Sequence, residues 1–259
     1  AVAVAAEACA EDTKGQTCFI CTQALHWKTK EGLVRGCACR GTAGFAHVSC
    51  LTEQAKLLFA EAEENNLGPK ALTERWARWE TCSLCKQRYH GVVKCAMGWA
   101  CWKTYVGRPE GDKIRLAAMS EVGNGLSASL RQEDALSARK AELAMKRRYV
   151  RSPAVILNAQ GSLARTYSLL GRKEEALSMQ RDVYSGCLKL YGEEDISTLR
   201  EASHYASILG DIQRFEEAKV LLRKTLPVAG RIFGEDHIRM LEMRCLYAAA
   251  SFQVDNCLL

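Results

Sequence analysis

The chain is short of proline and of long apolar runs. Proline accounts for 4 of its 259 residues, and nowhere do about 18 apolar residues follow one another. Because a membrane-spanning helix needs about 20 such residues in a row, no membrane span is predicted. The first residues, Ala1–Ala8, have no basic stretch ahead of their apolar run, which does not fit a secretory signal peptide.

Basic clusters and enzyme motifs are also missing. Lys and Arg number 36 against 30 Asp and Glu, for a formal net charge of +6, yet the cations form neither a run nor a stripe interleaved with aromatic residues. We therefore expect no nucleic-acid partner. The sequence contains no nucleophile elbow and no glycine-rich phosphate loop, so no catalytic side chain is predicted.

Cysteine, in contrast, is abundant, with 13 residues. Eight potential metal ligands fall in four close pairs: Cys18 and Cys21, Cys37 and Cys39, His47 and Cys50, and Cys82 and Cys85. Such spacing lets one tight backbone turn present two ligands to the same ion. Eight ligands fill two tetrahedral zinc sites and leave no open position for a substrate water, so two structural Zn²⁺ ions are predicted. Spacing alone does not say which pair joins which.

The order of the ligands, with Cys37-Ala38-Cys39 followed after seven residues by His47, resembles the RING-CH (RINGv) family. This resemblance implies a cross-brace, in which the first and third pairs share one ion and the second and fourth pairs share the other. A plant homeodomain finger has the same ligand order but usually places its histidine closer to the fourth ligand. The 31 residues between Cys50 and Cys82 make a longer insert than RING-CH usually allows.

The same resemblance implies ubiquitin-protein ligase activity, with a ubiquitin-conjugating enzyme as partner. In that family an apolar residue just before the second ligand contacts the conjugating enzyme, and Ile20 occupies this place. Many RING-type ligases have a basic residue after the eighth ligand that contacts ubiquitin, and Lys86 matches it. Where many of them have proline in the last knuckle, this chain has Leu84 as the apolar contact.

The other six cysteines are scattered through mostly apolar, helical surroundings: Cys9, Cys95, Cys101, Cys187, Cys245 and Cys257. Free cysteine packs as a small hydrophobic residue, so we interpret these six as buried thiols. Free thiols indicate a reducing compartment, the cytosol or the nucleus.

Two helices are predicted inside the long insert. The first has an amphipathic stripe of Leu51, Ala55, Leu58, Phe59 and Ala62, and ends at the Asn65–Gly68 segment. Pro69 suits the first turn of the second.

From about residue 114 the chain repeats itself with a period of 42. That shift aligns Arg172–Ala176 with Arg214–Ala218, and Tyr191–Glu194 with Phe233–Asp236. A weaker copy begins at Arg131. Each unit reads as two helices, with paired glutamates opening the second one, where the helix dipole favours them.

These repeats resemble the tetratricopeptide repeat in its kinesin-light-chain-like form, on the residues Leu163-Ala164, Gly171–Ala176 and Gly192-Glu193. The sequence thus predicts a mainly α protein with four parts: a flexible leader (1–16), a two-zinc cross-brace RING-CH-like domain with a helical insert (17–92), a connecting segment (93–113) and an α-solenoid of tetratricopeptide-like helix pairs (114–259) whose last unit is incomplete.

The helix pairs are expected to recruit a protein or peptide substrate in a groove. The candidate groove residues are Asn158, Arg165, Arg200 and His204. The hypothesis is a RING-CH-type ligase. Two alternatives are a non-enzymatic zinc-braced scaffold and a plant-homeodomain-like peptide reader, whose aromatic cage would need Trp27 or Trp79.

Overall fold

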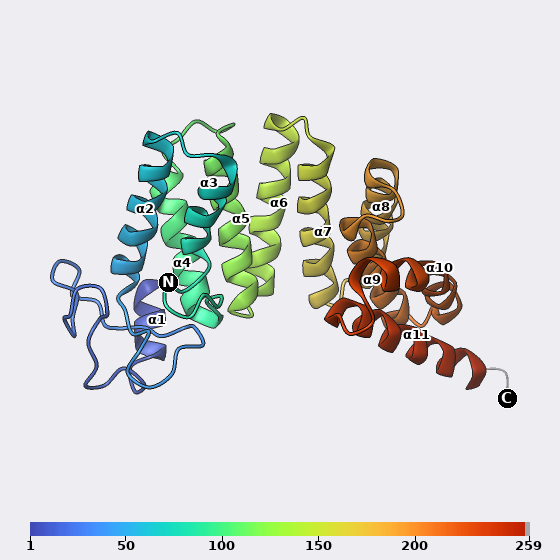
Figure 1. The fold of residues 1–259 in the computed structure, drawn as a ribbon, viewed down its shortest axis with the longest axis horizontal. Coiled ribbons are helices and arrows are strands. Elements are labelled where there is room, and N and C mark those ends of the chain that lie inside the picture. Colours follow the sequence, from blue (N-terminus) through green and yellow to red (C-terminus); the bar gives the residue numbers. More distant parts are fainter. Residues whose placement is uncertain (257–259) are drawn as a thin grey trace. The chain divides into compact units, whose positions relative to one another are not determined.

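The computed structural model describes residues 1–256 and is mainly helical, as the sequence predicts (Figure 1). The chain divides into two compact units, Ala1–Met145 and Lys146–Leu259. No strand occurs among the described residues. Residues 257–259, which hold Cys257 and the end of the predicted repeat region, lie outside them.

The helices in chain order begin with α1 (Val2–Ala8), α2 (Val48–Glu64), α3 (Pro69–Trp76), the 3₁₀ turn η1 (Ala77–Trp79), α4 (Gly91–Tyr105), α5 (Lys113–Ala128) and α6 (Gln132–Tyr149). They continue with α7 (Pro153–Leu169), α8 (Lys173–Tyr191), α9 (Ile196–Asp211), α10 (Phe215–Phe233) and α11 (Ile238–Asn256). None of these helices, in the part of the chain that the structure describes, has the length and apolar composition that crossing a membrane requires.

Both helices of the zinc-ligand insert form where the sequence predicts them. α2 buries most of the predicted stripe and ends at Glu64, after which Asn66 takes a left-handed φ of 50°. Pro69 opens α3, since its fixed φ suits a first helical turn.

Residues 1–16, expected to form a flexible leader, instead begin with a helix. α1 buries Ala5, which is 0% exposed, in the same hydrophobic core as the cysteine-rich loops and α4. Cys9, just past the helix, is buried in that core as well. Because alanine favours helix and its small side chain permits close packing, this run forms a packing surface.

Segment 93–113, expected only to connect two domains, contains most of α4, which packs closely on α5. Glycines set the separation of the two helices. A Cβ on Gly98 would lie 2.4 Å from the carbonyl oxygen of Glu121, and one on Gly125 would lie 2.8 Å from that of Lys94. α4 and α5 both lie in the first compact unit, which ends at residue 145.

A buried ion pair also joins α4 to α5. The ammonium of Lys94 donates to the carboxylate of Glu121 at 2.6 Å, and both side chains are less than a tenth exposed. Burial raises the pKa of Glu121, and the nearby Glu80 raises it further, whereas Lys94 opposes the shift. The pair therefore holds α4 and α5 together at a point that is largely shielded from solvent.

In the second unit the 42-residue period holds to the residue. α8 and α10 start at 173 and 215 and end at 191 and 233, while α9 and α11 start at 196 and 238. The residue that reverses the chain after the first helix of a pair is left-handed at equivalent positions: Gly171 and Gln213 in this unit, with φ of 73° and 63°, and Leu130 in the first unit, with φ of 62°. Glycine is thus used at only one of three equivalent turns.

Four cysteines outside the metal-ligand pairs are buried, as predicted: Cys9, Cys95, Cys101 and Cys187. Cys245 differs, because it lies on the exposed side of α11. All the cysteines of the described residues are free thiols in the structure.

Candidate metal centres and interaction face

The eight predicted ligands lie in two sets of four. Site 1 comprises Cys18, Cys21, His47 and Cys50, and site 2 comprises Cys37, Cys39, Cys82 and Cys85. Within each set the ligand atoms all lie within 4.8 Å of one another. The first pair joins the third and the second joins the fourth, as the RING-CH resemblance implies. The two clusters fit two zinc sites.

Distances inside each set suit tetrahedral zinc. Nδ1 of His47 lies 3.4 Å from Sγ of Cys21 and 3.6 Å from Sγ of Cys50. Sγ of Cys39 lies 3.8 Å from Sγ of Cys82, too far for a disulfide. Zinc–sulfur bonds of about 2.3 Å and zinc–nitrogen bonds of about 2.0 Å imply tetrahedron edges of roughly 3.5–3.8 Å, so the residues fit the ion.

The electrostatics of the ligands also call for a cation. Burial raises the pKa of Cys37 and of Cys50, and contacts with other thiols of the same set raise both further. These two thiols therefore resist ionisation until a positive charge is placed beside them, whereas for Cys18 and Cys85 burial is outweighed by hydrogen bonds within their sites, which lower the pKa. Burial lowers the pKa of His47, which favours the neutral imidazole that binds metals.

His47 is held in orientation by groups behind it. Its Nε2 lies 3.3 Å from the carbonyl oxygen of Ala24, so a neutral ring with Nδ1 facing the thiols donates its proton there. The ring of His26 meets it edge to face, with centroids 5.3 Å apart. The side chain is 0% exposed, so the imidazole ring is enclosed by protein and does not face solvent.

Site 2 depends on one glycine for its shape. Gly44 has a φ of 84°, and a Cβ at this position would lie 2.5 Å from Cβ of Cys39. Any other residue would be strained in this conformation and would push the Cys37-Ala38-Cys39 turn away.

The first and last ligand pairs form two knuckles with the same hydrogen bonds. The backbone N–H of Ile20 donates to Sγ of Cys18, and that of Leu84 donates to Sγ of Cys82, each at 3.4 Å. These bonds stabilise the thiolates that zinc requires and fix the turns between the ligands.

Each knuckle presents an apolar side chain to solvent. Ile20 is 37% exposed and Leu84 is 49% exposed. Lys86 has a left-handed φ of 59° and its ammonium donates to the carbonyl of Ser83, within its own knuckle. Contact of these three residues with a conjugating enzyme or ubiquitin stays a prediction.

The two tryptophans that a peptide-reading cage would need lie in different environments. Trp79 is 0% exposed and packs in the core with Trp76 and Tyr105. Trp27 is 68% exposed. Because a fully buried ring cannot line a peptide site, Trp79 is not available for such a cage and Trp27 is the exposed candidate.

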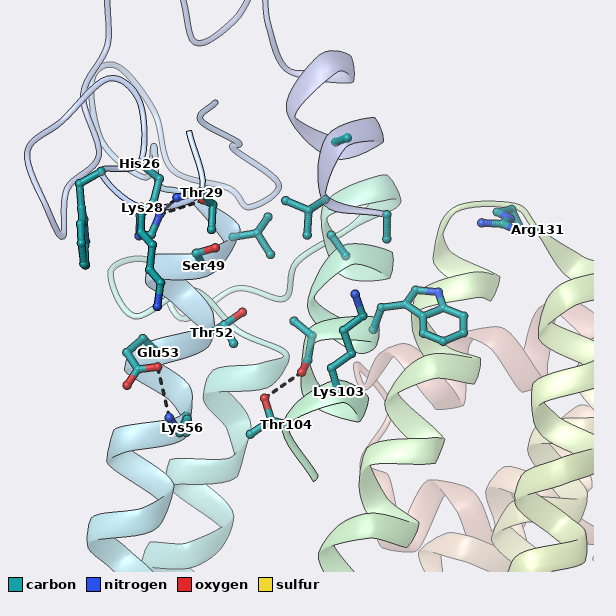
Figure 2. Close-up of a pocket in the computed structure, with 18 residues that line it drawn as sticks. His26, Lys28, Thr29, Ser49, Thr52, Glu53, Lys56, Lys103, Thr104 and Arg131 are labelled. Atoms are coloured by element: carbon teal, nitrogen blue, oxygen red, sulfur yellow. Dashed lines mark hydrogen bonds and ion pairs between the residues drawn. The ribbon is translucent and has the colours of Figure 1, made fainter. Parts of the chain in front are cut away.

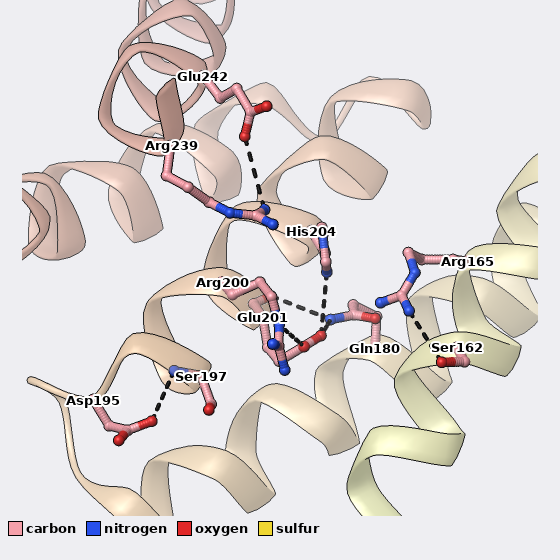
Figure 3. A network of polar contacts seen from close by, with 10 residues as sticks. All are labelled: Ser162, Arg165, Gln180, Asp195, Ser197, Arg200, Glu201, His204, Arg239 and Glu242. Atoms are coloured by element: carbon pink, nitrogen blue, oxygen red, sulfur yellow. Dashed lines mark hydrogen bonds and ion pairs between the residues drawn. The ribbon is translucent and has the colours of Figure 1, made fainter. Parts of the chain in front are cut away.

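Of the predicted groove residues, two contact the buried carboxylate of Glu201, and a third, Arg165, donates to Ser162 nearby (Figure 3). Arg200 and His204 belong to α9, and Arg165 comes from α7. A Cβ built on Gly161 of α7 would meet both Glu201 and Arg165. Asn158 lies exposed on α7, outside this group.

Glu201 is the centre of a polar network that the sequence did not predict. Its carboxylate accepts from Nε of Arg200 at 2.8 Å and from Nε2 of Gln180 at 2.8 Å, and lies 3.3 Å from Nδ1 of His204. Burial alone would raise the pKa of Glu201, but the hydrogen bonds from His204, Gln180 and Arg200 prevail and lower it to about 2.

A signal for this network is present in the repeat register. Shifting by 42 residues places Leu222 opposite Gln180 and Met243 opposite Glu201. Leu222 and Met243 are both buried in an apolar cluster. One repeat thus uses a hydrogen-bonded polar pair where the next uses an apolar pair, and this joint departure from the repeat marks the site.

Two protein-family models match parts of the chain. Residues 18–65 match the RING-variant domain, and residues 156–197 and 203–239 match the tetratricopeptide repeat. The first match ends before Cys82 and Cys85, so it is the tertiary structure that brings this last pair to Cys37 and Cys39. The chain carries a RING-variant zinc-binding region followed by tetratricopeptide repeats.

Solved structures show the helical fold. A Podosopora anserina protein described as kinesin light chain nearly identical TPR-like repeats aligns with a TM-score of 0.54 at 18% identity, over 81% of this chain and 89% of that one. BtubC (BKLC) from P. vanneervenii aligns with a TM-score of 0.52 at 17% identity, over 62% of this chain and 70% of that one. Among curated proteins, none matches the chain.

Proposed function

We propose that this chain is a ubiquitin-protein ligase of RING-CH type. The observation that carries the proposal is the pair of matching knuckles, each with an exposed apolar residue, Ile20 or Leu84, beside a set of four candidate zinc ligands. Exposed apolar residues on a rigid, metal-held turn are suited to bind a partner, because little side-chain or backbone freedom is lost on binding.

In this proposal zinc supplies only structure, by cross-linking loops that have no core of their own. Ile20 and Leu84 contact the ubiquitin-charged conjugating enzyme, and Lys86 contacts ubiquitin. No side chain of the chain attacks the thioester. Rate comes from restricting the freedom of the bound thioester so that the attacking amine meets it in a reactive orientation.

The repeats recruit the protein substrate. Arg165, Arg200 and His204 present hydrogen-bond donors near the buried Glu201, which holds two of them in place (Figure 3). Asn158, exposed on α7, is proposed as a further contact. Donors held by a buried carboxylate lose less freedom on binding a peptide. The free thiols of the described residues support a reducing compartment, the cytosol or the nucleus, for this activity.

The test is single-turnover discharge of ubiquitin from a panel of charged conjugating enzymes. We expect the wild-type chain to accelerate discharge and Ile20→Ala to lose about tenfold or more of that acceleration, as expected for an interface anchor. Val106→Ala is the matched control, since Val106 is 39% exposed in the same unit but lies away from both zinc sites.

If protein shown to hold two zinc ions accelerated no member of the panel, the ligase proposal would be rejected in favour of a zinc-braced scaffold. If Val106→Ala lost as much as Ile20→Ala, the loss would reflect stability and not contact.

A further inference from the structure

A cleft of about 1250 Å³ opens in the first unit, outside both zinc sites (Figure 2). One wall consists of the loop 26–29 and the first turns of α2, and the other consists of α4 between Ala96 and Thr104. Residues 1–3, at the start of α1, also line the cleft. Arg131, just before α6, lies at one end. All of its lining residues belong to one compact unit, so the cleft is a feature of that unit alone.

Its lining is strongly cationic. Four cations line the cleft, Lys28, Lys56, Lys103 and Arg131, with one acidic residue, Glu53. Arg131 forms an ion pair at 2.6 Å with Asp134, which lies outside the lining. Glu53 is 3.5 Å from Lys56, with which it forms an exposed ion pair. Lys28 and Lys103 have no acidic partner among the residues that the structure describes. In Figure 2 the ammonium groups of these two lysines point into the cleft from opposite walls.

Aromatic and small side chains complete the lining. Trp27 is 68% exposed at one edge, and Trp99 is half-buried on the α4 side. Between them Val48, Ala96 and Ala100 contribute small apolar surface. An exposed tryptophan beside a cationic cleft is the type of residue that dominates binding energy at protein interfaces.

We propose that this cleft binds an acidic peptide segment of a partner protein, with its carboxylates on Lys28 and Lys103 and an apolar side chain against Trp27. The volume exceeds the roughly 300–1,000 Å³ of small-molecule sites, and the cations come from separate segments instead of converging on one group. Nucleic acid fits less well, because its evenly charged backbone would meet Glu53, where a peptide can place a neutral residue.

This inference does not rest on ligase activity, because the cleft is lined by neither knuckle and its test uses no ubiquitin. The probe is a capped peptide of about twelve residues, with glutamate at alternate positions, one central leucine and serine elsewhere. Binding to the full-length, zinc-loaded chain is measured by titration calorimetry and by tryptophan fluorescence. We expect saturable one-to-one binding that weakens several-fold between about 0.05 M and 0.3 M salt.

The decisive variant is Lys28→Glu with Lys103→Glu, which should weaken binding about tenfold or more because two attractions become repulsions. The matched control is Lys70→Glu with Lys113→Glu, an equal change of charge at exposed lysines of the same unit outside the cleft. The control should bind the peptide as the wild type does.

Trp27→Ala should also weaken binding while leaving the salt dependence unchanged, because it removes apolar contact only. The proposal would be overturned if the two charge-reversed double variants lost peptide affinity equally, or if the wild-type chain did not bind the peptide. Tighter binding of an oligothymidylate of the same length than of the peptide would overturn the choice of a peptide.

Discussion

The buried carboxylate of Glu201 provides the sharpest test of the packing described here. Replacing it by glutamine keeps the shape of the side chain but removes its charge. The new amide NH₂ would face one of the donors, Arg200 or Gln180, so that a donor meets a donor and that hydrogen bond is lost. We expect the second unit to lose stability at neutral pH.

The size of the loss follows from the pKa. Glu201 titrates at about 2 in the folded chain against 4.5 for an unperturbed glutamate. That difference corresponds to about 3 kcal/mol of stability at neutral pH. Because the amide keeps one acceptor oxygen, we expect Glu201→Gln to cost about 2 kcal/mol. Since the folded pKa is the lower one, this stability is present above pH 4.5 and is lost as the pH falls toward 2.

Urea unfolding followed by two signals isolates the effect. All five tryptophans lie in the first unit, at positions 27, 76, 79, 99 and 102. Far-ultraviolet circular dichroism reports helices of both units, whereas tryptophan fluorescence reports the first. The variant should shift the dichroism transition to lower urea at pH 7, and the shift should shrink progressively below pH 4.5.

Two further variants make the reasoning refutable. Glu217→Gln breaks an exposed pair with Arg214 and should shift the transition far less. The double variant Gln180→Leu with Glu201→Met copies the apolar pair of the next repeat and should recover most of the lost stability. If Glu201→Gln left the transition unmoved at pH 7, or if its effect did not depend on pH, the network would not be the stabilising element described.

Two other predictions concern the first unit. Cys82→Ser should lower the zinc content from two ions to one in a colorimetric metal assay, because it removes a ligand of site 2. The control Cys245→Ser, at an exposed thiol that is not a ligand, should retain two ions. Two ions bound to Cys82→Ser would contradict the ligand set. Gly98→Ala should destabilise the tryptophan-monitored transition by about 1–3 kcal/mol, because its Cβ would meet the Glu121 carbonyl oxygen at 2.4 Å. Gly107→Ala, with open space around it, should change it little, and equal effects of the two would refute the close helix contact.

Local signals were enough for much of the fold and for the metal centres. The spacing of the ligand pairs predicted two structural sites, and the structure gathers those same eight residues in two sets. The apolar stripe of α2 and the proline at the start of α3 were readable because helix periodicity and capping depend on residues a few positions apart. The 42-residue register likewise reproduces the helix boundaries of the second unit.

Other features depended on contacts between distant residues. Segment 93–113 was expected to be a connection, yet Gly98 allows α4 to lie against the backbone of α5, a contact that depends on distant residues. The leader was expected to be flexible because a short alanine-rich segment has little helix stability alone, and its burial on the core supplies the rest. Trp27 and Trp79 were equivalent candidates until the fold exposed one and buried the other.

The amino-acid sequence alone determined which residues can bind zinc, how many ions they fill, and where the repeated helices begin and end. Ligand spacing and helix formation depend on residues a few positions apart, so both can be predicted from short stretches of sequence. Only the tertiary structure decided that Cys82 and Cys85 meet Cys37 and Cys39 in the way the resemblance implied, and that Glu201 is buried among donors. Those outcomes depend on which surfaces bury together, because burial and charge pairing are set by neighbours far away in the chain.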